Sequence, residues 1–561
     1  MKKALSILCA ACIAAASTAQ INVLPRSTAA AQGVEPAALA RFVDSMMAVP
    51  RTDIHHLMVL RHGKVIAEVH PAPYRADDPH TLFSCSKTFT ALAVGIAVDE
   101  NRLRVTDRVA AFFPQKLPPI VSPELARLTV HDLLTMHTGI TPTDVVRNGT
   151  DDWVASYLSQ EINPEAPYQY DSMCTFVLSA IVQRVTGMTV LDYLKDRLFT
   201  PMGITHLDWE HSPDGITAGG WGLRLQAESQ AKLALLINNK GNWEGRQLVS
   251  EEWLNLMCAK QIDPKPETTP PTEGNQGYGY QIWMCRMPGA LRADGAFAQY
   301  IVMVPHLDLA VVINSVSYRL NGWIELGHIW DILVPALHDT PVTASKADER
   351  KLAKSLERPI SSEIPPMRST RKSAEKWVKN SQICTLTLED NDWGLKTLNF
   401  YMDGDMLNMT VNDDSFAYGA GNGKWVINES LGARNPLPPY NVKAQARFDG
   451  LENDFRCAAS YGWTGPHTLV IRQEWPTWFA GRTMTIDFIA GTLTLVHNWA
   501  QQSPIIIPFT LDYRSRWSTM LLTWSKVLPA SGETTASIVA ALYAPNCVPS
   551  PTMKYMPLGL K

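Results

Sequence analysis

The spacing of apolar and polar positions changes along the chain, and each change predicts a different element. Residues 56–69 form two short apolar runs separated by His62-Gly63, a pattern typical of a β-hairpin. Residues 91–98 are small and almost continuously apolar, and a helix that is hydrophobic on all sides is a buried one. Residues 130–136 and 175–185 repeat their apolar positions at helical spacing, so a helical segment should follow the first strands.

Strand patterns return in the second half of this region. The runs 293–304 and 307–314 predict another hairpin, with Pro305-His306 at its turn. Residues 323–337 predict a further helix. Strands at both ends of a helical middle indicate an α+β domain, which we assign to residues 20–340, with a sheet built from segments that are distant in the sequence.

The composition changes after residue 340. Residues 341–375 are charged and rich in Pro and Ser, which predicts a linker. Residues 376–513 contain short alternating runs between Gly and Asn/Asp turns, which predict an antiparallel β-sandwich or small barrel. Residues 514–561 match neither pattern, and no element is predicted for them.

Residues 1–19 have the pattern of a secretory signal peptide. A basic start is followed by a small apolar stretch and by Ser17-Thr-Ala19, which fits a small-x-small cleavage site. We therefore expect an exported protein, periplasmic or extracellular. Acylation of Cys12 would instead make it a lipoprotein, and an ordinary apolar helix is the purely structural alternative. No other stretch reaches the ~18–20 apolar residues that a bilayer span needs.

The composition is that of a globular protein long enough for two or three domains, with 46% hydrophobic and 19% charged residues. The net charge of −4 gives no basic face for a nucleic-acid partner. Seven of the nine Cys follow the signal segment, and they lack the spacing of a metal site. We expect no metal or organic cofactor. Disulfide pairing and the oligomeric state are not determined by these patterns.

The strongest candidate for chemistry is Ser84-Cys-Ser-Lys87 at the mouth of the buried helix. Residues three apart on a helix share a face, so Ser84 and Lys87 should point the same way. A serine hydroxyl needs a base to take its proton, and a lysine becomes such a base when burial lowers its pKa. The structural alternative is that Ser84 caps the helix and Lys87 lies on the surface. Cys85 is a less suitable nucleophile, since a helical neighbour points about 100° away.

Ser-x-x-Lys also occurs at three other places. Ser369/Lys372 and Ser373/Lys376 lie in the charged stretch predicted as a linker. Ser229/Lys232 begins an amphipathic run, where Ser is more simply a residue at a helix start. Only the pair at Ser84 precedes a continuously apolar helix.

A serine–lysine pair needs a further acid/base group and an oxyanion site. Tyr170 stands directly before a predicted helix, and near a cationic lysine it would hold a lowered pKa and relay a proton. Ser172 would complete the polar cluster. Gly295, in Asp294-Gly295-Ala296, would let a backbone approach a bound acyl group, and the Ala296 N–H with the Ser84 N–H would bind the oxyanion. Packing at a helix start and an ordinary strand start are the structural alternatives.

The order of these parts resembles the serine β-lactamase and penicillin-binding-protein superfamily, and most of all its class-C-like serine hydrolases. The resemblance is carried by Ser84-Cys-Ser-Lys87, Leu128 to Gly139, Tyr170-Asp-Ser172 and Asp294-Gly295. Gly219-Gly-Trp-Gly-Leu223 and Gln299 to Leu309 extend it, so that it covers roughly residues 35–335.

This resemblance implies a β-lactamase/transpeptidase-like domain, in which helices flank an antiparallel sheet and a helical subdomain covers the cleft. It also implies that Ser84 forms an acyl-enzyme, that Lys87 and Tyr170 share the proton transfers, and that water completes hydrolysis. Trp221 would then be a substrate contact. The substrate would be a small ester or amide or a short peptide, cleaved by an esterase, a D-aminopeptidase or carboxypeptidase, or an amino-acid-oligomer hydrolase.

Two departures from the pattern bear on the substrate. The usual Tyr-x-Asn is Tyr170-Asp-Ser172, which replaces an amide by a hydroxyl. The usual Lys-Thr-Gly or His-x-Gly is Ala293-Asp294-Gly295, which replaces a cation by an anion. Arg292 is adjacent, but on a strand it faces the other side from Ala293. A neutral or cationic ester or amide therefore fits better than a β-lactam carboxylate.

Two further interpretations stay open. The protein could be a binding or sensor module that acylates slowly or not at all, although the complete Ser84, Lys87 and Tyr170 set favours an enzyme. The β-rich domain could also bind polymer through exposed Trp side chains, while burial in a core is the more frequent fate of such residues. The candidates for that role are Trp463, Trp475, Trp478 and Trp499.

Overall fold

The computed structural model describes most of the two predicted domains. The described ranges are residues 23–142, 150–265, 272–317, 323–357, 381–391, 394–412, 418–429, 456–497 and 504–515. The predicted signal peptide, Trp499 and residues 516–561 lie outside the described residues, and the signal peptide stays a prediction. No single helix in the described ranges is long and apolar enough to cross a bilayer. One bent pair of helices, Ser172–Thr186 with Val190–Phe199, meets the length and composition of a span when the two are counted together.

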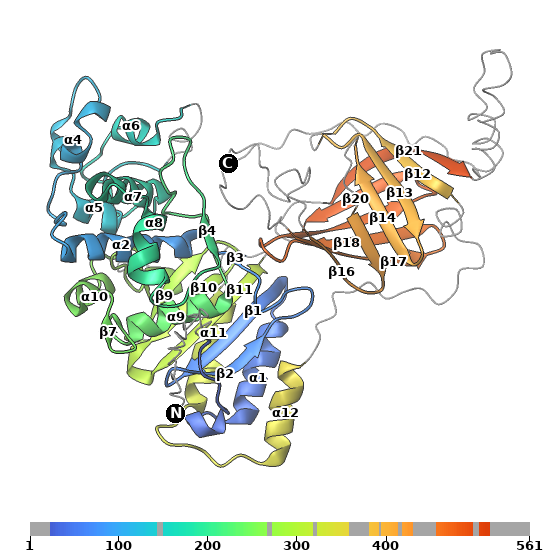
Figure 1. Cartoon of the computed structure of the whole chain (residues 1–561), viewed down its shortest axis with the longest axis horizontal. Helices are drawn as coiled ribbons and strands as arrows, with labels where there is room; N and C mark the ends of the chain where they lie inside the picture. Colours follow the sequence, from blue (N-terminus) through green and yellow to red (C-terminus); the bar gives the residue numbers. More distant parts are fainter. Residues whose placement is uncertain are drawn as a thin grey trace, which may run out of the picture.

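The first domain is built on a six-stranded antiparallel sheet in the order β2-β1-β11-β10-β9-β8 (Figure 1). Inside this sheet β1 pairs with β11, so segments more than two hundred residues apart meet as neighbours, as the sequence predicts. The β1–β2 hairpin has its turn at His62-Gly63, also as predicted. The six strands are β1 (Thr52–Arg61), β2 (Lys64–Val69), β8 (Trp283–Met284), β9 (Leu291–Gly295), β10 (Gln299–Val304) and β11 (Leu309–Ser317).

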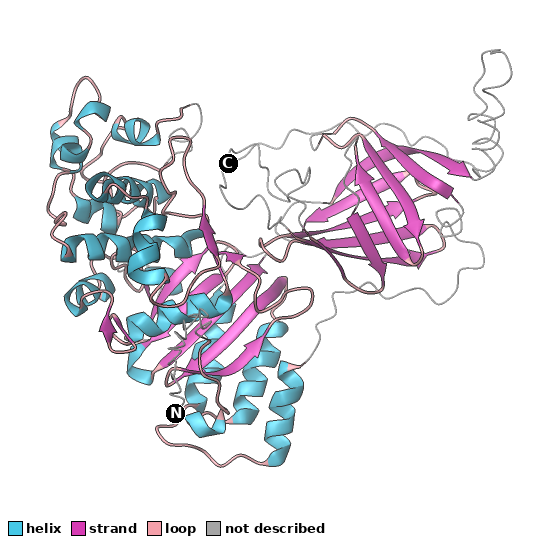
Figure 2. Ribbon diagram, in the orientation of Figure 1, coloured by secondary structure: helices cyan, strands magenta, loops and turns pink. Residues whose placement is uncertain are grey.

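Helices cover both faces of this sheet (Figure 2). Leu57 and Val59 of β1 belong to the core under α1, whereas Met58 and Leu60 belong to the core that contains α2. This alternation follows from the two-residue period of a strand. The helices of the first face are α1 (Pro36–Met47), α11 (Trp323–His328) and α12 (Lys346–Leu356), and those of the second are α2 (Ser86–Asp99) and α9 (Ala227–Asn238).

A helical subdomain extends from α2 and supplies a second wall of the candidate site. Its longest helix, α7 (Ser172–Thr186), packs on α2 and α5 and begins at an Asp171 cap whose Oδ1 accepts from the Met173 N–H at 2.8 Å. The remaining helices are α3 (Val109–Phe112), α4 (Pro123–Arg127), α5 (Val130–Thr135), α6 (Trp153–Leu158), α8 (Val190–Leu194) and α10 (Glu251–Cys258). A three-stranded sheet has the order β3 (His80–Thr81), β5 (Leu223–Leu225), β4 (Leu207–Trp209). A two-stranded sheet pairs β6 (Asn242–Trp243) with β7 (Arg246–Gln247).

Two sequence predictions need correction. Residues 293–304 are not one strand, because a turn at Ala296–Ala298 divides them into β9 and β10. In this turn Phe297 and Ala298 have φ of 62° and 64°. Positive φ is uncommon for residues other than Gly, so these residue types do not predict the turn. The predicted linker 341–375 begins with α12, which packs on α1 through Leu352. The exposed face of this helix is charged, so its composition is similar to that of a linker. Residues 358–375 lie outside the described ranges.

The second domain is a β-barrel, one of the two predicted architectures. Its sheet follows the order β15-β14-β13-β12-β21-β20-β19-β18-β17-β16, and parallel pairing of β15 with β17 closes it. Trp463 and Trp475 are buried in its core, and Trp478 is partly buried, so the first two do not form a stacking surface. The strands are β12 (Ser381–Leu388), β13 (Thr397–Asp403), β14 (Met406–Val411), β15 (Tyr418–Asn422), β16 (Val426–Asn428), β17 (Cys457–Gly465), β18 (Thr468–Glu474), β19 (Gly481–Asp487), β20 (Thr492–His497) and β21 (Ile505–Ser515).

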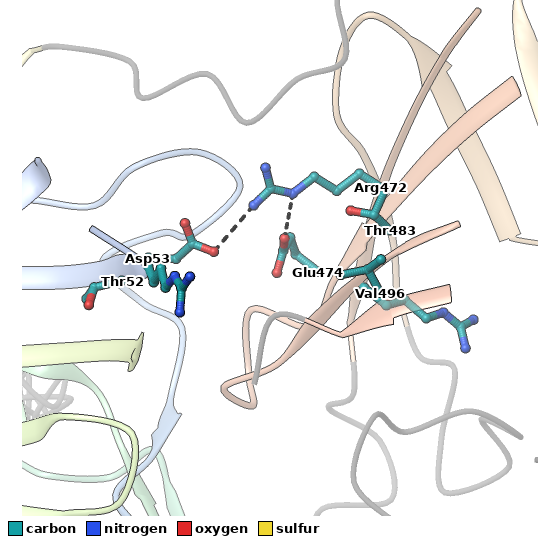
Figure 3. Close-up of a pocket in the computed structure, with 8 residues that line it drawn as sticks. Thr52, Asp53, Arg472, Glu474, Thr483 and Val496 are labelled. Atoms are coloured by element: carbon teal, nitrogen blue, oxygen red, sulfur yellow. Dashed lines mark hydrogen bonds and ion pairs between the residues drawn. The ribbon is translucent and has the colours of Figure 1, made fainter. Parts of the chain in front are cut away.

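The barrel contacts the first domain through charged and aromatic side chains. Arg472 lies between Glu474 of its own strand, at 2.8 Å, and Asp53 of β1, at 3.6 Å (Figure 3). Arg456 forms an ion pair with Asp78 of the first domain at 2.8 Å, and the two side chains are only 8% and 1% exposed. Since buried ions require partners, these contacts bind the two domains to each other.

We predict that Arg456→Met destabilises the protein by about 2 kcal/mol, because it removes the nearer of the two arginines paired with the buried Asp78 carboxylate and leaves Arg75 at 3.5 Å. The measurement is the free energy or midpoint of unfolding followed on the full chain. Arg127→Met, which removes an exposed pair with Glu124, is the matched control and should cost less than about 1 kcal/mol. Equal losses in the two variants would contradict the structural role of the Arg456 pair.

Candidate active site

Ser84 lies in a 3-10 turn, Phe83–Cys85, that leads directly into α2. It is partly exposed, whereas almost all of α2 is buried against the sheet and α7. The helix cap is Cys85, and no side chain caps there, so the alternative that Ser84 is an N-cap is wrong. Phe83 has φ of 47°, which turns the chain sharply before Ser84. The turn therefore presents the Ser84 hydroxyl at the edge of a buried helix.

The Lys87 amino group lies at the centre of the candidate site. Its Nζ donates to Ser84 Oγ at 2.8 Å, to Ser172 Oγ at 2.9 Å and to the Gly220 carbonyl at 2.7 Å. The side chain is 1% exposed, so the alternative of a surface lysine is wrong. Burial lowers the pKa of Lys87 to about 7, although the nearby Asp171 carboxylate acts in the opposite direction. At pH 7 about half of the protein molecules therefore carry Lys87 as a neutral amine.

The three contacts suit both charge states of this amine. An ammonium group donates three hydrogen bonds, one to each oxygen. A neutral amine has two N–H groups and one lone pair, and a carbonyl oxygen such as that of Gly220 is only an acceptor. Donation to Gly220 and Ser172 then leaves the lone pair facing the Ser84 hydroxyl. The site can therefore take up the Ser84 proton without losing a hydrogen bond.

Tyr170 is part of the same cluster but not in the state that its sequence context predicts. Its hydroxyl shares a hydrogen bond with Ser84, and Lys87 Nζ lies 4.8 Å from its ring centroid. Burial raises the pKa of Tyr170 well above its ordinary value, and the bond to Ser84 only partly offsets this. The lowered pKa expected from the lysine is thus wrong, because burial of the phenol dominates. Tyr170 is a neutral phenol that can donate a proton.

Ser172 is the first residue of α7, and its hydroxyl contacts Lys87. The sequence places it where a substrate-contacting amide is usual. In this structure its role is to hold the lysine, together with the Gly220 carbonyl. Gly220 was missed because a backbone carbonyl has no residue-type signature. The glycine-rich string around it was the available signal, since a Cβ at Gly220 would lie 2.6 Å from the Ser172 carbonyl oxygen.

Asp294 and Arg292 lie on the same face of β9, as the strand period predicts, and form an ion pair at 2.8 Å. Arg292 also donates to the Met284 and Glu273 carbonyls at 2.9 and 3.0 Å, and it is 1% exposed. Burial raises the pKa of Asp294, whereas Arg292 opposes this shift. Asp294 is therefore part of a neutralised pair rather than an isolated anion.

Gly295 ends β9 and packs beside the segment that leads into Ser84, and Ala296 begins the next turn. A Cβ at Gly295 would overlap the Leu82 carbonyl oxygen and would lie 2.9 Å from Gln299 Cβ. The glycine thus allows β9 to pack against the segment that leads into Ser84, and its role in admitting an acyl group stays a prediction. Ala296 is exposed in the following turn, which leaves its backbone at the surface of the site.

Trp221 lies beside Trp153 and Trp209, and its role as a substrate contact stays a prediction. Its ring packs 6.0 Å from that of Trp153, and its carbonyl accepts from Trp209 Nε1 at 2.8 Å. A different aromatic group, missed in the sequence, lies beside the cluster: the Trp283 ring is 5.6 Å from Tyr170 and 4.8 Å from Tyr278. Trp283 follows a short irregular segment, so no periodic pattern marks it.

Cys85 is excluded as the nucleophile. Its thiol donates to the Gln299 carbonyl at 3.3 Å inside the core, and burial raises its pKa well above the ordinary value. Five of the described cysteines are free thiols: Cys85, Cys174, Cys258, Cys285 and Cys457. Within the same ranges, no group of three or more His, Cys, Asp or Glu residues has the arrangement to hold a metal ion.

Comparison with known proteins agrees with this geometry. The Beta-lactamase family profile matches residues 39–319, just over half of the 561 residues. Penicillin-binding protein 4 of Amycolatopsis lactamdurans is 32% identical over 181 residues, which are 30% of this chain and 44% of that protein. The 6-aminohexanoate-dimer hydrolase of Paenarthrobacter ureafaciens is 24% identical over 338 residues, 54% of this chain and 82% of that protein. Lovastatin esterase of Penicillium rubens is 25% identical over 164 residues, 24% of this chain and 40% of the esterase.

The match thus spans less than half the length of two of these three relatives. Among solved structures, a putative 6-aminohexanoate-dimer hydrolase from Bacillus anthracis has a TM-score of 0.45 at 16% identity, and covers 55% of this chain and 84% of its own. The octameric penicillin-binding protein homologue from Pyrococcus abyssi has a TM-score of 0.42 at 15% identity, with 84% and 99% covered. On the profile match, the chain belongs to the Beta-lactamase family.

Proposed function

We propose that this protein is an exported serine hydrolase that cleaves a small ester or amide through an acyl-enzyme on Ser84. Its family contains serine hydrolases, and relatives bear the names of an amide-cleaving hydrolase and an esterase. The observation that carries the proposal is the buried Lys87, whose pKa near 7 and 2.8 Å distance to Ser84 Oγ make it a base for that hydroxyl.

Acylation would proceed in a balanced sequence. Lys87 takes the Ser84 proton as Oγ attacks the substrate carbonyl carbon, and the oxyanion binds the backbone N–H groups of Ser84 and Ala296. The neutral Tyr170 hydroxyl donates its proton to the leaving alcohol or amine as the tetrahedral intermediate collapses. The resulting phenolate faces the Lys87 ammonium, whose charge stabilises it.

Deacylation would reverse these transfers with water in place of the leaving group. The Tyr170 phenolate takes a proton from water as the hydroxide attacks the acyl carbonyl carbon. The Lys87 ammonium returns its proton to Ser84 Oγ as the carboxylic acid leaves. Each residue thus ends in its starting protonation state.

The charges around the site favour a neutral or cationic substrate. Arg292 is poorly placed to hold a substrate carboxylate, because its hydrogen bonds go to Asp294, Met284, Glu273 and Cys285. The rings of Tyr170 and Trp283 lie 5.6 Å apart and would pack on an apolar or cationic group. An ester or amide without a carboxylate next to the cleaved bond fits these surroundings.

We predict that a fluorophosphonate probe labels the native protein once and that Ser84→Ala abolishes the label, because only an activated serine reacts. Intact mass measures the adduct. Ser229→Ala, at the other described Ser-x-x-Lys, is the matched control and should keep the label, since Lys232 donates instead to the Met202 carbonyl at 2.9 Å. A folded native protein that remains unlabelled would favour the non-hydrolytic binding or sensor module.

We predict that kcat/KM for a p-nitrophenyl ester rises with pH through an apparent pKa of about 7. Below this pH Lys87 is protonated and cannot accept the Ser84 proton. Asp171→Asn should lower the apparent pKa, because it removes the negative charge that raises the pKa of Lys87, while Asn still caps α7. Asp152→Asn changes a matched cap, that of α6, and should leave the profile unchanged. A profile that does not respond to Asp171→Asn would contradict Lys87 as the base.

We predict that a chromogenic cephalosporin is hydrolysed with a kcat/KM about 100-fold below that of the neutral ester, because Arg292, the arginine next to Asp294, is already engaged by protein acceptors. Steady-state rates with both substrates on one preparation test this. Comparable rates would show that the site accepts the cephalosporin carboxylate, and would favour a true β-lactamase.

A further inference from the structure

The barrel reaches the candidate site through the loop 475–480 between β18 and β19. Phe479 and Ala480 of this loop are fully buried, although the loop projects away from the barrel core. They form a small apolar cluster with Val316 of β11, against which Phe83 and Phe297 of the first domain also pack. The barrel thus contributes side chains to the interior of the catalytic domain rather than only touching its surface.

Phe479 contacts both phenylalanines of the first domain. Its ring centroid lies 4.7 Å from Phe83 in an edge-to-face arrangement and 4.7 Å from Phe297 in a stacked one. Phe83 and Phe297 are themselves 5.3 Å apart. Phe479 thus joins the two rings of the first domain, and Trp478 of the same loop lies 5.8 Å from it. Such contacts contribute about 0.5–1.5 kcal/mol per pair beyond burial.

The two partners of Phe479 stand directly next to the proposed oxyanion donors. Phe83 precedes Ser84, and Phe297 follows Ala296. Both have positive φ, 47° and 62°, a conformation that bulky residues adopt only where the surroundings enforce it, at about 1–3 kcal/mol each. The dihedrals of Phe83 orient the peptide that carries the Ser84 N–H. Those of Phe297 shape the turn that carries the Ala296 N–H.

A hydrogen bond to the first domain fixes the position of the loop that carries Phe479. The Thr477 carbonyl accepts from Arg224 Nη1 at 2.9 Å, and Arg224 is a fully buried residue of β5 that also pairs with Asp208. Strand β5 pairs in turn with β3, through Arg224 and Thr81, and its Leu223 carbonyl accepts from the Leu82 N–H at 2.9 Å. The same strand therefore holds the barrel loop and the chain that enters the Ser84 turn.

We propose that Phe479 of the barrel is a positioning residue for the oxyanion site, in that its ring holds Phe83 and Phe297 in the conformations that direct the Ser84 and Ala296 N–H groups at the substrate carbonyl. The inference rests on the proposed function, because it assigns a task to the barrel within the same reaction. It makes the second domain part of the catalytic unit.

The test compares full-length Phe479→Ala, Phe479→Leu and native protein in ester hydrolysis. Oxyanion stabilisation acts in the transition state, so Phe479→Ala should lower kcat about 10- to 100-fold with KM nearly unchanged. Leu restores apolar volume without the ring and should recover part of the loss. Phe488→Leu is the matched control: Phe488 stacks on Trp463 in the barrel core, away from the interface, and this change should leave kcat and KM unchanged.

Several outcomes would overturn the proposal. They are a native kcat in Phe479→Ala, an equal loss in Phe488→Leu, or a rise in KM alone. A crystal structure of Phe479→Leu in which the backbone at Phe83 and Ala296 is unmoved would also overturn it, even if Phe479→Ala fails to fold. Failure of the proposed function looks different, because the native protein itself would then not be labelled at Ser84 by the fluorophosphonate.

Discussion

The placement of one amino group inside the protein is the constraint on which the rest of the structure depends. Lys87 is buried, and its three oxygen partners come from the Ser84 turn, the start of α7 and the glycine-rich loop before β5. These segments belong to different parts of the domain, so the sheet, the helical subdomain and the loop must all be folded before the contacts exist. The lowered pKa of Lys87 is thus a property of the whole domain.

The surroundings of this group are polar enough to accept its hydrogen bonds but contain little compensating charge. The Asp171 carboxylate caps α7 at 2.8 Å from the Met173 N–H, and its charge only partly offsets the burial of Lys87. The Asp294 carboxylate is paired with Arg292. Desolvation therefore outweighs attraction, and the pKa of Lys87 falls to about 7. An arrangement with a carboxylate in direct contact with Lys87 would instead keep it charged and unable to act as a base.

The barrel extends this interdependence beyond the family domain. Charged contacts such as Arg456 with Asp78 attach it to the first domain, and the Phe479 loop enters the core next to the Ser84 turn. The two kinds of contact have different consequences. Ion pairs between domains stabilise the attachment, whereas the aromatic contacts act on two backbone segments with unfavourable dihedrals. A strained turn needs such support from residues that are distant in the sequence.

Periodicity and residue type by themselves determined the two domains, the β1–β2 hairpin, α2 and α7, and the order of Ser84, Lys87 and Tyr170, because these follow from local spacing. Tertiary structure decided the rest. It divided residues 293–304 at a turn, recruited Gly220 through a carbonyl that has no side-chain signature, and closed the β-rich domain as a barrel. It also reversed the expected pKa shift of Tyr170, because burial depends on contacts between segments that are far apart in the chain.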